Sequence, residues 1–232
     1  MRFFLGILVA CCFSSCYEIR ELVHINIDGS GRYELQLDFT HSKLELSRLT
    51  ALTKEEAALL GVSRNPFSVL DSVFKEGAAT LNSLPGIVGA VSTNDPLNFK
   101  YGITFEFYDV DILNSALTHL DSREFESPPV YYEYNLKGKF SKSRQQVFAH
   151  LMEVFPSQQE DLPDEVRQYF EQLYNSMTYK LILSTEGKIK RSVNDNAIVS
   201  VDRKQLLFTA FVRELQEEEV DWENTVKFKT KR

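Results

Sequence analysis

The stretch EIRELVHINIDGSGRYELQLDF, residues 18–39, decides the fold of this chain. Apolar and polar residues alternate over residues 18–27 and again over residues 33–39, which is the pattern of a strand with one buried face. The segment Asp28-Gly29-Ser30-Gly31 between them carries two glycines, which allow a tight reversal of the backbone. We therefore predict a β-hairpin. The residues expected on the buried side of its first strand are Ile19, Val23, Ile25 and Ile27.

The rest of the chain repeats this plan of strand pairs separated by amphipathic helices. Apolar residues at helical spacing predict helices over residues 66–82, 109–120, 143–155 and 163–175. Val73 belongs to the predicted apolar stripe of the first helix, and either Asp109 or Asp111 can cap the start of the second. Alternation and turn residues predict strands at 87–92, 99–108, 130–136, 178–184, 189–193, 198–201 and 205–212. Adjacent strand pairs with helices between them favour an α+β fold, in which amphipathic helices cover one face of an antiparallel or mixed β-sheet.

The first residues, MRFFLGILVACCFSSC, have the layout of an export signal. Arg2 supplies the positive start and Phe3 to Phe13 form an apolar run that ends in small residues. About eleven residues at about 1.5 Å each cannot span a hydrocarbon core of about 30 Å. We therefore predict a signal peptide at residues 1–15 and one α+β domain at 16–232, with a helical insertion at 143–176. An ordinary secretory signal cut elsewhere and an N-terminal strand are the alternatives.

The segment Phe13-Ser14-Ser15-Cys16 resembles the bacterial lipobox, although the lipobox prefers Leu at the first position and Ala or Gly before the cysteine. The resemblance implies a diacylglyceryl group with palmitate-type chains on Cys16, and cleavage just before this residue. The other two cysteines, Cys11 and Cys12, would leave with the signal, so the mature domain has no disulfide. Two acyl chains give stable anchoring. We expect attachment through Cys16 to the extracytoplasmic side of a membrane, at the outer membrane or the periplasmic face.

A wider resemblance begins at Cys16-Tyr17-Glu18-Ile19 and the Asp28-Gly29-Ser30-Gly31 turn. The chain resembles uncharacterised exported bacterial lipoproteins whose mature part starts with such a hairpin. Leu84-Pro85-Gly86-Ile87 and Thr104-Phe105-Glu106-Phe107 fit the same group. The resemblance implies an envelope lipoprotein with an α+β domain, and it brings no catalytic residues.

The charge of the chain narrows the classes of partner. A net charge of −7 argues against a nucleic-acid partner and against electrostatic adhesion to anionic lipid. The C-terminal segment Lys227-Phe228-Lys229-Thr230-Lys231-Arg232 is a local exception, which we interpret as a solvated tail. Because Cys16 lies directly before the first strand, we expect the domain to sit against the bilayer.

Motifs for catalysis and metal binding are weak. The sequence has no G-x-S-x-G, P-loop, H-E-x-x-H or C-x-x-C motif. Ser72 and Lys75 match S-x-x-K, but the partner motifs are absent and both flank the apolar stripe of a helix. Asp28 and Ser30 are too few donors for a calcium loop. The histidines His24, His41, His119 and His150 lie far apart, so we predict no metal, no cofactor and no enzyme.

Aromatic residues are the remaining clue, with 17 Phe and 10 Tyr. We assign most of them to the core, including Phe105, Phe107, Phe208 and Tyr179. Alternation places Tyr132 and Tyr134 on one face of a strand and Tyr131 on the other, so we expect at least one of the three to be exposed. The predicted function is a non-enzymatic, lipid-anchored binding or assembly module with envelope protein partners. A carrier of a lipophilic ligand is the first alternative, and a hydrolase with a site assembled from distant residues is the second.

Overall fold

The computed structural model describes residues 17–42, 66–121, 124–143, 175–217, 219–221 and 223–229. Their strands are β1 (Glu18–Ile25), β2 (Gly31–Asp38), β3 (Ile87–Asp95), β4 (Lys100–Phe107), β5 (Tyr132–Asn135), β6 (Lys139–Lys142), β7 (Thr178–Thr185), β8 (Ile189–Ser192), β9 (Ala197–Val199), β10 (Gln205–Phe211) and β11 (Asn224–Phe228). The helices are η2 (Thr40–Ser42), α4 (Pro66–Leu81), α5 (Val110–Leu120) and α8 (Val212–Gln216). Four predictions fall outside the described residues: the signal peptide, Cys16, His150 and the helices at 143–155 and 163–175, of which only the end residues 143 and 175 are described.

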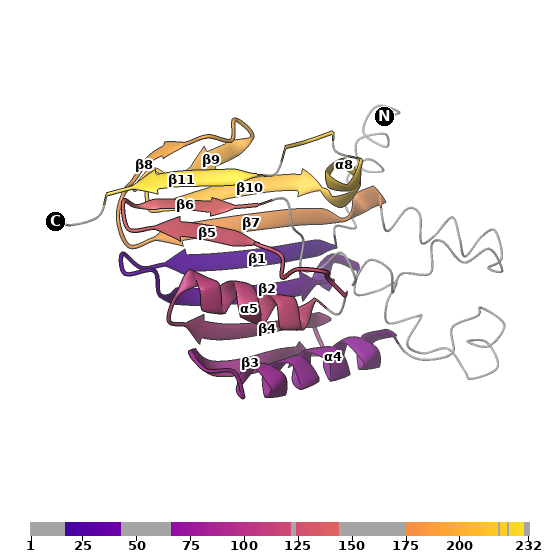
Figure 1. Cartoon of the computed structure of the whole chain (residues 1–232). Coiled ribbons are helices and arrows are strands. Elements are labelled where there is room, and N and C mark those ends of the chain that lie inside the picture. Colours follow the sequence, from indigo (N-terminus) through magenta and orange to yellow (C-terminus); the bar gives the residue numbers. More distant parts are fainter. Residues whose placement is uncertain are drawn as a thin grey trace, which may run out of the picture.

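Two sheets form the scaffold (Figure 1). The large sheet has the strand order β3-β4-β2-β1-β7-β10-β9, and the small sheet has the order β5-β6-β11-β8. Strand β1 runs parallel to β7, whereas its other neighbour β2 is antiparallel, so the large sheet is mixed. The predicted α+β class with hairpin-built strands is confirmed. The second sheet is an addition that the sequence analysis did not contain.

One face of the large sheet is covered by helices over part of its width and by the small sheet over the rest (Figure 1). Helices α4 and α5 contact β3 and β4. They contribute Phe74, Leu81, Leu113 and Leu117 to the core. Val73, predicted to lie on the apolar stripe of α4, is 45% exposed because its side chain points away from the sheet.

Part of the C-terminal segment belongs to a strand rather than to the solvated tail that we predicted. Lys227 and Phe228 lie in β11, whereas residues 230–232 lie outside the described residues. Strand β11 pairs with β6 on one side and with β8 on the other. Val226 and Phe228 are buried, whereas Lys227 between them is exposed. The sequence hid this alternation because Lys227 and Lys229 flank Phe228 and are followed by Lys231 and Arg232, so the segment looks like a block of charge.

A buried carboxylate joins the two sheets. Glu21, on the inward side of β1, is fully buried. Its Oε1 accepts hydrogen bonds from the hydroxyls of Tyr132 (2.6 Å) and Tyr33 (3.1 Å), and its Oε2 accepts one from Tyr179 (2.5 Å). The Nζ of Lys142, from β6, lies 3.3 Å from Oε2. Since Lys142 and Tyr132 belong to the small sheet and Glu21 to the large one, this cluster fixes how the sheets pack.

Burial sets the ionisation of this cluster. It raises the pKa of Tyr33, Tyr132 and Tyr179 well above the ordinary value of 10.0, and the charge of Glu21 raises it further. Burial also lowers the pKa of Lys142, and the neighbouring Glu21 offsets part of this effect. The three tyrosines therefore act as neutral hydrogen-bond donors to one carboxylate.

Lys142→Met should destabilise the protein by about 3–5 kcal/mol, because it leaves the Glu21 carboxylate buried without its cation. Urea unfolding would measure this loss. Combining Lys142→Met with Glu21→Gln removes both charges and should recover most of the stability. Lys139→Met, on the exposed side of the same strand, is the matched control and should change stability by less than about 0.5 kcal/mol. Equal effects at positions 139 and 142 would contradict the role of this ion pair.

Stability should also fall steeply at alkaline pH. A tyrosine with a raised folded-state pKa contributes stability that is complete below pH 10 and is lost as the pH rises, by about 1.4 kcal/mol per pH unit. Lys142 acts in the opposite direction, but only below its unfolded pKa of 10.5. Urea unfolding between about pH 10.5 and 11.5 should therefore show a slope that Tyr33→Phe makes shallower. Tyr108→Phe, at a 65% exposed position, should leave the slope unchanged.

Candidate functional site

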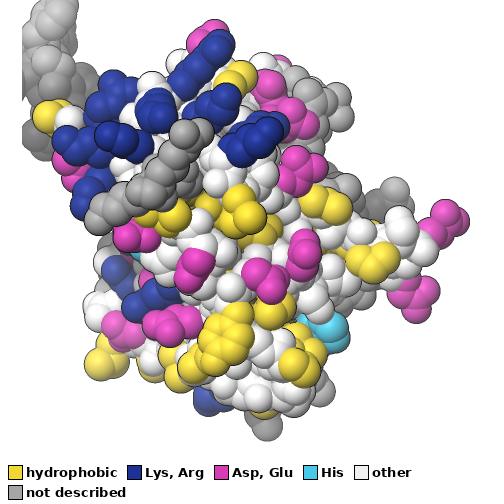
Figure 2. All heavy atoms as spheres, turned by 60° about the vertical axis from the view of Figure 1, so that its left-hand side comes forward, with side chains coloured by type: hydrophobic (Ala, Val, Ile, Leu, Met, Phe, Trp, Pro, Cys, Tyr) yellow, Lys and Arg dark blue, Asp and Glu magenta, His cyan; other side chains and the backbone are white. Residues whose placement is uncertain are grey.

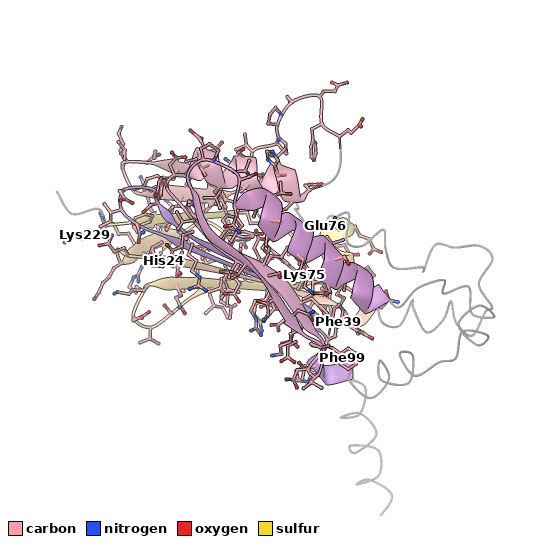
Figure 3. The ribbon with its side chains drawn as sticks, turned by 90° about the horizontal axis from the view of Figure 1, so that it is seen from below. His24, Phe39, Lys75, Glu76, Phe99 and Lys229 are labelled. Carbon is pink, nitrogen blue, oxygen red and sulfur yellow. The ribbon has the colours of Figure 1, made fainter. Side chains whose placement is uncertain are left out.

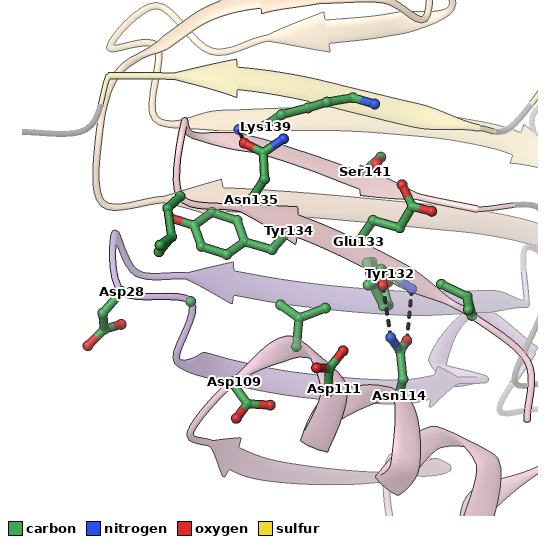
Figure 4. Close-up of a pocket in the computed structure, with 14 residues that line it drawn as sticks. Asp28, Asp109, Asp111, Asn114, Tyr132, Glu133, Tyr134, Asn135, Lys139 and Ser141 are labelled. Carbon is green, nitrogen blue, oxygen red and sulfur yellow. Dashed lines mark hydrogen bonds between the residues drawn. The ribbon is translucent and has the colours of Figure 1, made fainter.

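An open cleft of about 560 Å³ lies where three segments distant in the sequence meet. One wall is the turn between β1 and β2, and a second is the first turn of α5. The third is the outermost strand of the small sheet, β5, with its neighbour β6. Figure 4 shows the charged and amide side chains that line this space from all three segments. The cleft exists only because the small sheet packs beside α5.

The β1–β2 turn brings Asp28 to the cleft. The Asp28 carboxylate accepts hydrogen bonds from the backbone N–H (2.9 Å) and the hydroxyl (2.6 Å) of Ser30. These bonds lower the pKa of Asp28, so it is ionised at neutral pH. Gly29 has a φ of +92°, and a Cβ there would lie 3.0 Å from the ring of Tyr134. Glycine is thus required both for the turn and for the close approach of Tyr134, whose hydroxyl donates to the Ile27 carbonyl.

The start of α5 supplies two further carboxylates. Asp109 is the N-cap residue, and its side chain accepts a hydrogen bond from the Ile112 N–H at 2.8 Å. This confirms the predicted helix start. Asp111 lies in the first helical turn, where a negative charge is favoured by the helix dipole. Together with Asp28, these residues make one side of the cleft acidic (Figure 4).

Asn114 closes part of the free edge of the small sheet. Its side-chain oxygen accepts hydrogen bonds from the N–H groups of Tyr131 (3.0 Å) and Tyr132 (2.9 Å), and its Nδ2 donates to the Tyr132 carbonyl (2.8 Å). One amide side chain therefore makes hydrogen bonds to the strand edge of the kind that a neighbouring strand would make (Figure 4). Because alternate residues of a strand present their main-chain groups to the same side, those of Tyr134 face the cleft as well.

The opposite wall has a different character. Glu133, Asn135, Ser141 and Lys139 line it from the outer side of β5 and β6. Lys139 adds a cation to this wall, although its side chain extends away from the three aspartates (Figure 4), so the lining contains charges of both signs. Such a site can bind a polar ligand that carries hydrogen-bonding and charged groups.

The histidines and the S-x-x-K residues lie away from this cleft. His24 is on the opposite face of the large sheet, 2.9 Å from the Ser184 hydroxyl, and exposed His119 is 2.8 Å from the Ser115 carbonyl. Lys75 pairs with Asp71 at 2.7 Å on the exposed side of α4, and Figure 3 shows it far from His24. Within the described ranges, no three His, Cys, Asp or Glu side chains are placed to hold a metal ion.

The aromatic residues assigned to the core are there. Phe105, Phe107, Phe208 and Tyr179 are at most 1% exposed. Tyr131, expected on the side of the strand opposite to Tyr132, is instead buried before the strand begins, where its hydroxyl donates to Asp121. The expected exposed tyrosine of this group is Tyr134, which is partly exposed in the cleft.

Sequence reasoning named Asp28 and Asp109 for their structural roles but missed Asn114. An asparagine in the middle of a helix is a weak helix former whose side chain competes for backbone groups. The presence of such a residue within a predicted helix was the feature of the sequence that could have drawn attention to Asn114. It could not show which backbone Asn114 would bind.

Comparisons with known proteins give little further information. No protein-family model and no curated protein sequence matches the chain. Among solved structures, the chain is similar to the folded domain of the Mycobacterium tuberculosis LppM protein, determined by NMR, with a TM-score of 0.39 and 9% identity. The match covers 93% of this chain and 91% of that one. None of the helices in the described part of the chain combines the length and apolar character needed to cross a bilayer.

Asn114→Ala should destabilise the protein by about 1–3 kcal/mol, because it leaves three main-chain groups at the edge of β5 without their partner. Hydrogen exchange should become faster at the amides of Tyr131 and Tyr132. Ser115→Ala, at the adjacent exposed position of α5, is the matched control and should leave both quantities nearly unchanged. Unchanged exchange in Asn114→Ala would show that another group satisfies this edge.

Proposed function

We propose that this protein is a lipid-anchored cell-envelope protein that acts as a non-enzymatic binding or assembly module. The lipid is carried by Cys16, on the extracytoplasmic side of a membrane, and no cofactor takes part. The observation that supports this proposal is the burial of Tyr17, the residue that directly follows Cys16 in the sequence.

Tyr17, the first described residue, is fixed by side-chain packing and by a main-chain hydrogen bond. Its side chain is 2% exposed and packs edge-on against Phe39, with ring centroids 5.2 Å apart. Its carbonyl accepts a hydrogen bond of 2.8 Å from the Thr178 N–H. A lipid on Cys16 would therefore be separated from a rigid sheet by one peptide unit. Such a short connection supports a module that works close to its membrane.

The cleft supports a binding role. It is open, and charged and amide groups share its lining with apolar residues such as Val110, Val130 and Leu136. This mixed lining suits a polar ligand or a segment of an envelope protein better than the purely lipophilic ligand of a carrier. A hydrolase that works through a pair of carboxyl groups would need one of them with a raised pKa as general acid. Asp28 has the opposite shift, and Asp109 is engaged as a helix cap. We therefore favour binding over hydrolysis.

Processing at Cys16 tests the anchor. In a bacterial host, an inhibitor of lipoprotein signal peptidase should cause a larger precursor to accumulate, and Cys16→Ser should abolish lipid labelling of the product. Cys12→Ser, inside the predicted signal, is the matched control and should be processed normally. The size of the product on a gel and the incorporation of labelled fatty acid are the measurements. Lipid labelling of the Cys16→Ser chain, or a product size unaffected by the inhibitor, would refute the anchor.

A further inference from the structure

Positive charge gathers on the outer side of the small sheet, although the chain as a whole is acidic. Figure 2 shows Lys and Arg side chains crowded over one end of the molecule, with acidic side chains below them. All members of this group are exposed. We call it the basic face, and it consists of Lys137, Lys139, Lys190, Arg191, Lys227 and Lys229.

Strand register places three of these cations side by side. Lys227 on β11 lies opposite Lys139 on β6 and opposite Arg191 on β8. Directly opposed side chains in a sheet are about 4.5–5.5 Å apart, and like charges at this spacing destabilise the pair. The row therefore opposes folding stability, which points to a role outside the fold.

A β-bulge adds a further cation to the row. The register between β8 and β11 shifts between Lys227 and Phe228, so that Lys190 is an extra residue in β8. Ile189 remains buried on the inner side, while Lys190 and Arg191 are both exposed. Arg203 holds this segment, since its guanidinium donates to the carbonyls of Ile189 (2.7 Å) and Lys190 (2.8 Å). Bulges commonly redirect side chains toward a function.

No carboxylate neutralises the basic face within the described ranges. Ion pairs elsewhere in those ranges engage cations such as Arg20, Lys100 and Lys180, but none of the six residues of the basic face. Their fields therefore add up instead of cancelling, and they will attract anions within about one Debye length of the surface.

We infer that the basic face binds an anionic phospholipid surface. The face is the outer side of a sheet rather than a groove, and a sheet face suits a bilayer, whose charged headgroups are mobile and can match the row of cations. Each Lys or Arg near such a surface adds attraction to acidic lipid. Proteins that bind single-stranded nucleic acid instead combine a charged groove with aromatic side chains on which bases stack. Phe140 and Phe228, the aromatic residues of β6 and β11, are buried, and β8 contains no aromatic residue, so these three strands present no stacking side chain beside the cations.

The position of the basic face adds a constraint to the proposed anchor. Lys229 lies at one end of the molecule, whereas Phe39, which contacts Tyr17, lies at the other end (Figure 3). The lipid end and the basic face are thus about one strand length apart, roughly 25 Å for an eight-residue strand. The domain must lie along its own membrane, or reach a second one, for the face to touch lipid. The inference deepens the proposed function but does not need acylation to be true.

Lysine acetylation read by mass spectrometry tests the inference on the full chain. The protein is mixed with phosphatidylcholine vesicles, with or without about 30% phosphatidylglycerol, at 0.1 M salt. Lys190 and Lys229 should be protected only by the anionic vesicles, and 1 M salt should remove the protection because it shortens the Debye length to about 3 Å. Lys75, on α4, is the internal reference and should react equally in all samples. The Cys16→Ser chain should show the same pattern, which separates this result from the fate of the anchor.

Two triple variants, each of which removes three positive charges, compare the basic face with the rest of the surface. Neutralising the row with Lys139→Gln, Arg191→Gln and Lys227→Gln should weaken the protection of Lys137, Lys190 and Lys229 by about tenfold or more, without loss of stability. Neutralising cations of other elements with Arg20→Gln, Arg32→Gln and Arg213→Gln should leave it unchanged, and this variant keeps Lys75 as the reference. Equal protection by neutral vesicles, or no effect of the first variant, would overturn the inference. So would protection by single-stranded DNA at phosphate concentrations at which anionic vesicles have no effect.

Discussion

The contact between Glu21 and Lys142 is the interaction on which the rest of the structure depends. It joins the two sheets inside the core, where both side chains are at most 1% exposed, so the carboxylate cannot be satisfied by solvent. Three tyrosine hydroxyls from three different strands complete its coordination. A small sheet that slid along the large one would leave these groups unpaired. The cluster therefore selects one packing of two apolar surfaces that could otherwise slip.

Both functional surfaces follow from this packing. Once the small sheet is fixed, β5 lies beside α5, and Asn114 can reach the main chain of Tyr131 and of Tyr132, the first residue of β5. The same placement leaves the outer sides of β6, β11 and β8 facing solvent, where their lysines and arginines meet in one row. Lys139 belongs to both the cleft and the basic face. A ligand in the cleft and an anionic surface on the basic face would therefore influence each other through this residue.

Local patterns predicted most of the elements because each depends on neighbours in the sequence. The hairpin of β1 and β2, the helix α4 and the cap of α5 by Asp109 need only periodicity, glycine placement and a capping side chain. Strand β11 was missed, because its end runs into a cluster of basic residues that is typical of a solvated tail. Glu21 was missed for a related reason. It occupies an inward position between Ile19 and Val23, where a charged residue is stable only if distant tyrosines and Lys142 are present.

The sequence by itself determined the hairpin-rich α+β class, the core aromatics and the signal-like start ending at Cys16, because these rest on short-range periodicity and composition. Only the tertiary structure decided the two-sheet packing, the cleft and the basic face. Net charge could not reveal that face, since a sum over the chain contains no positions. Strand register and one β-bulge bring together cations from positions 139, 190–191 and 227, and hydrogen-bonded pairing across the sheet holds them there.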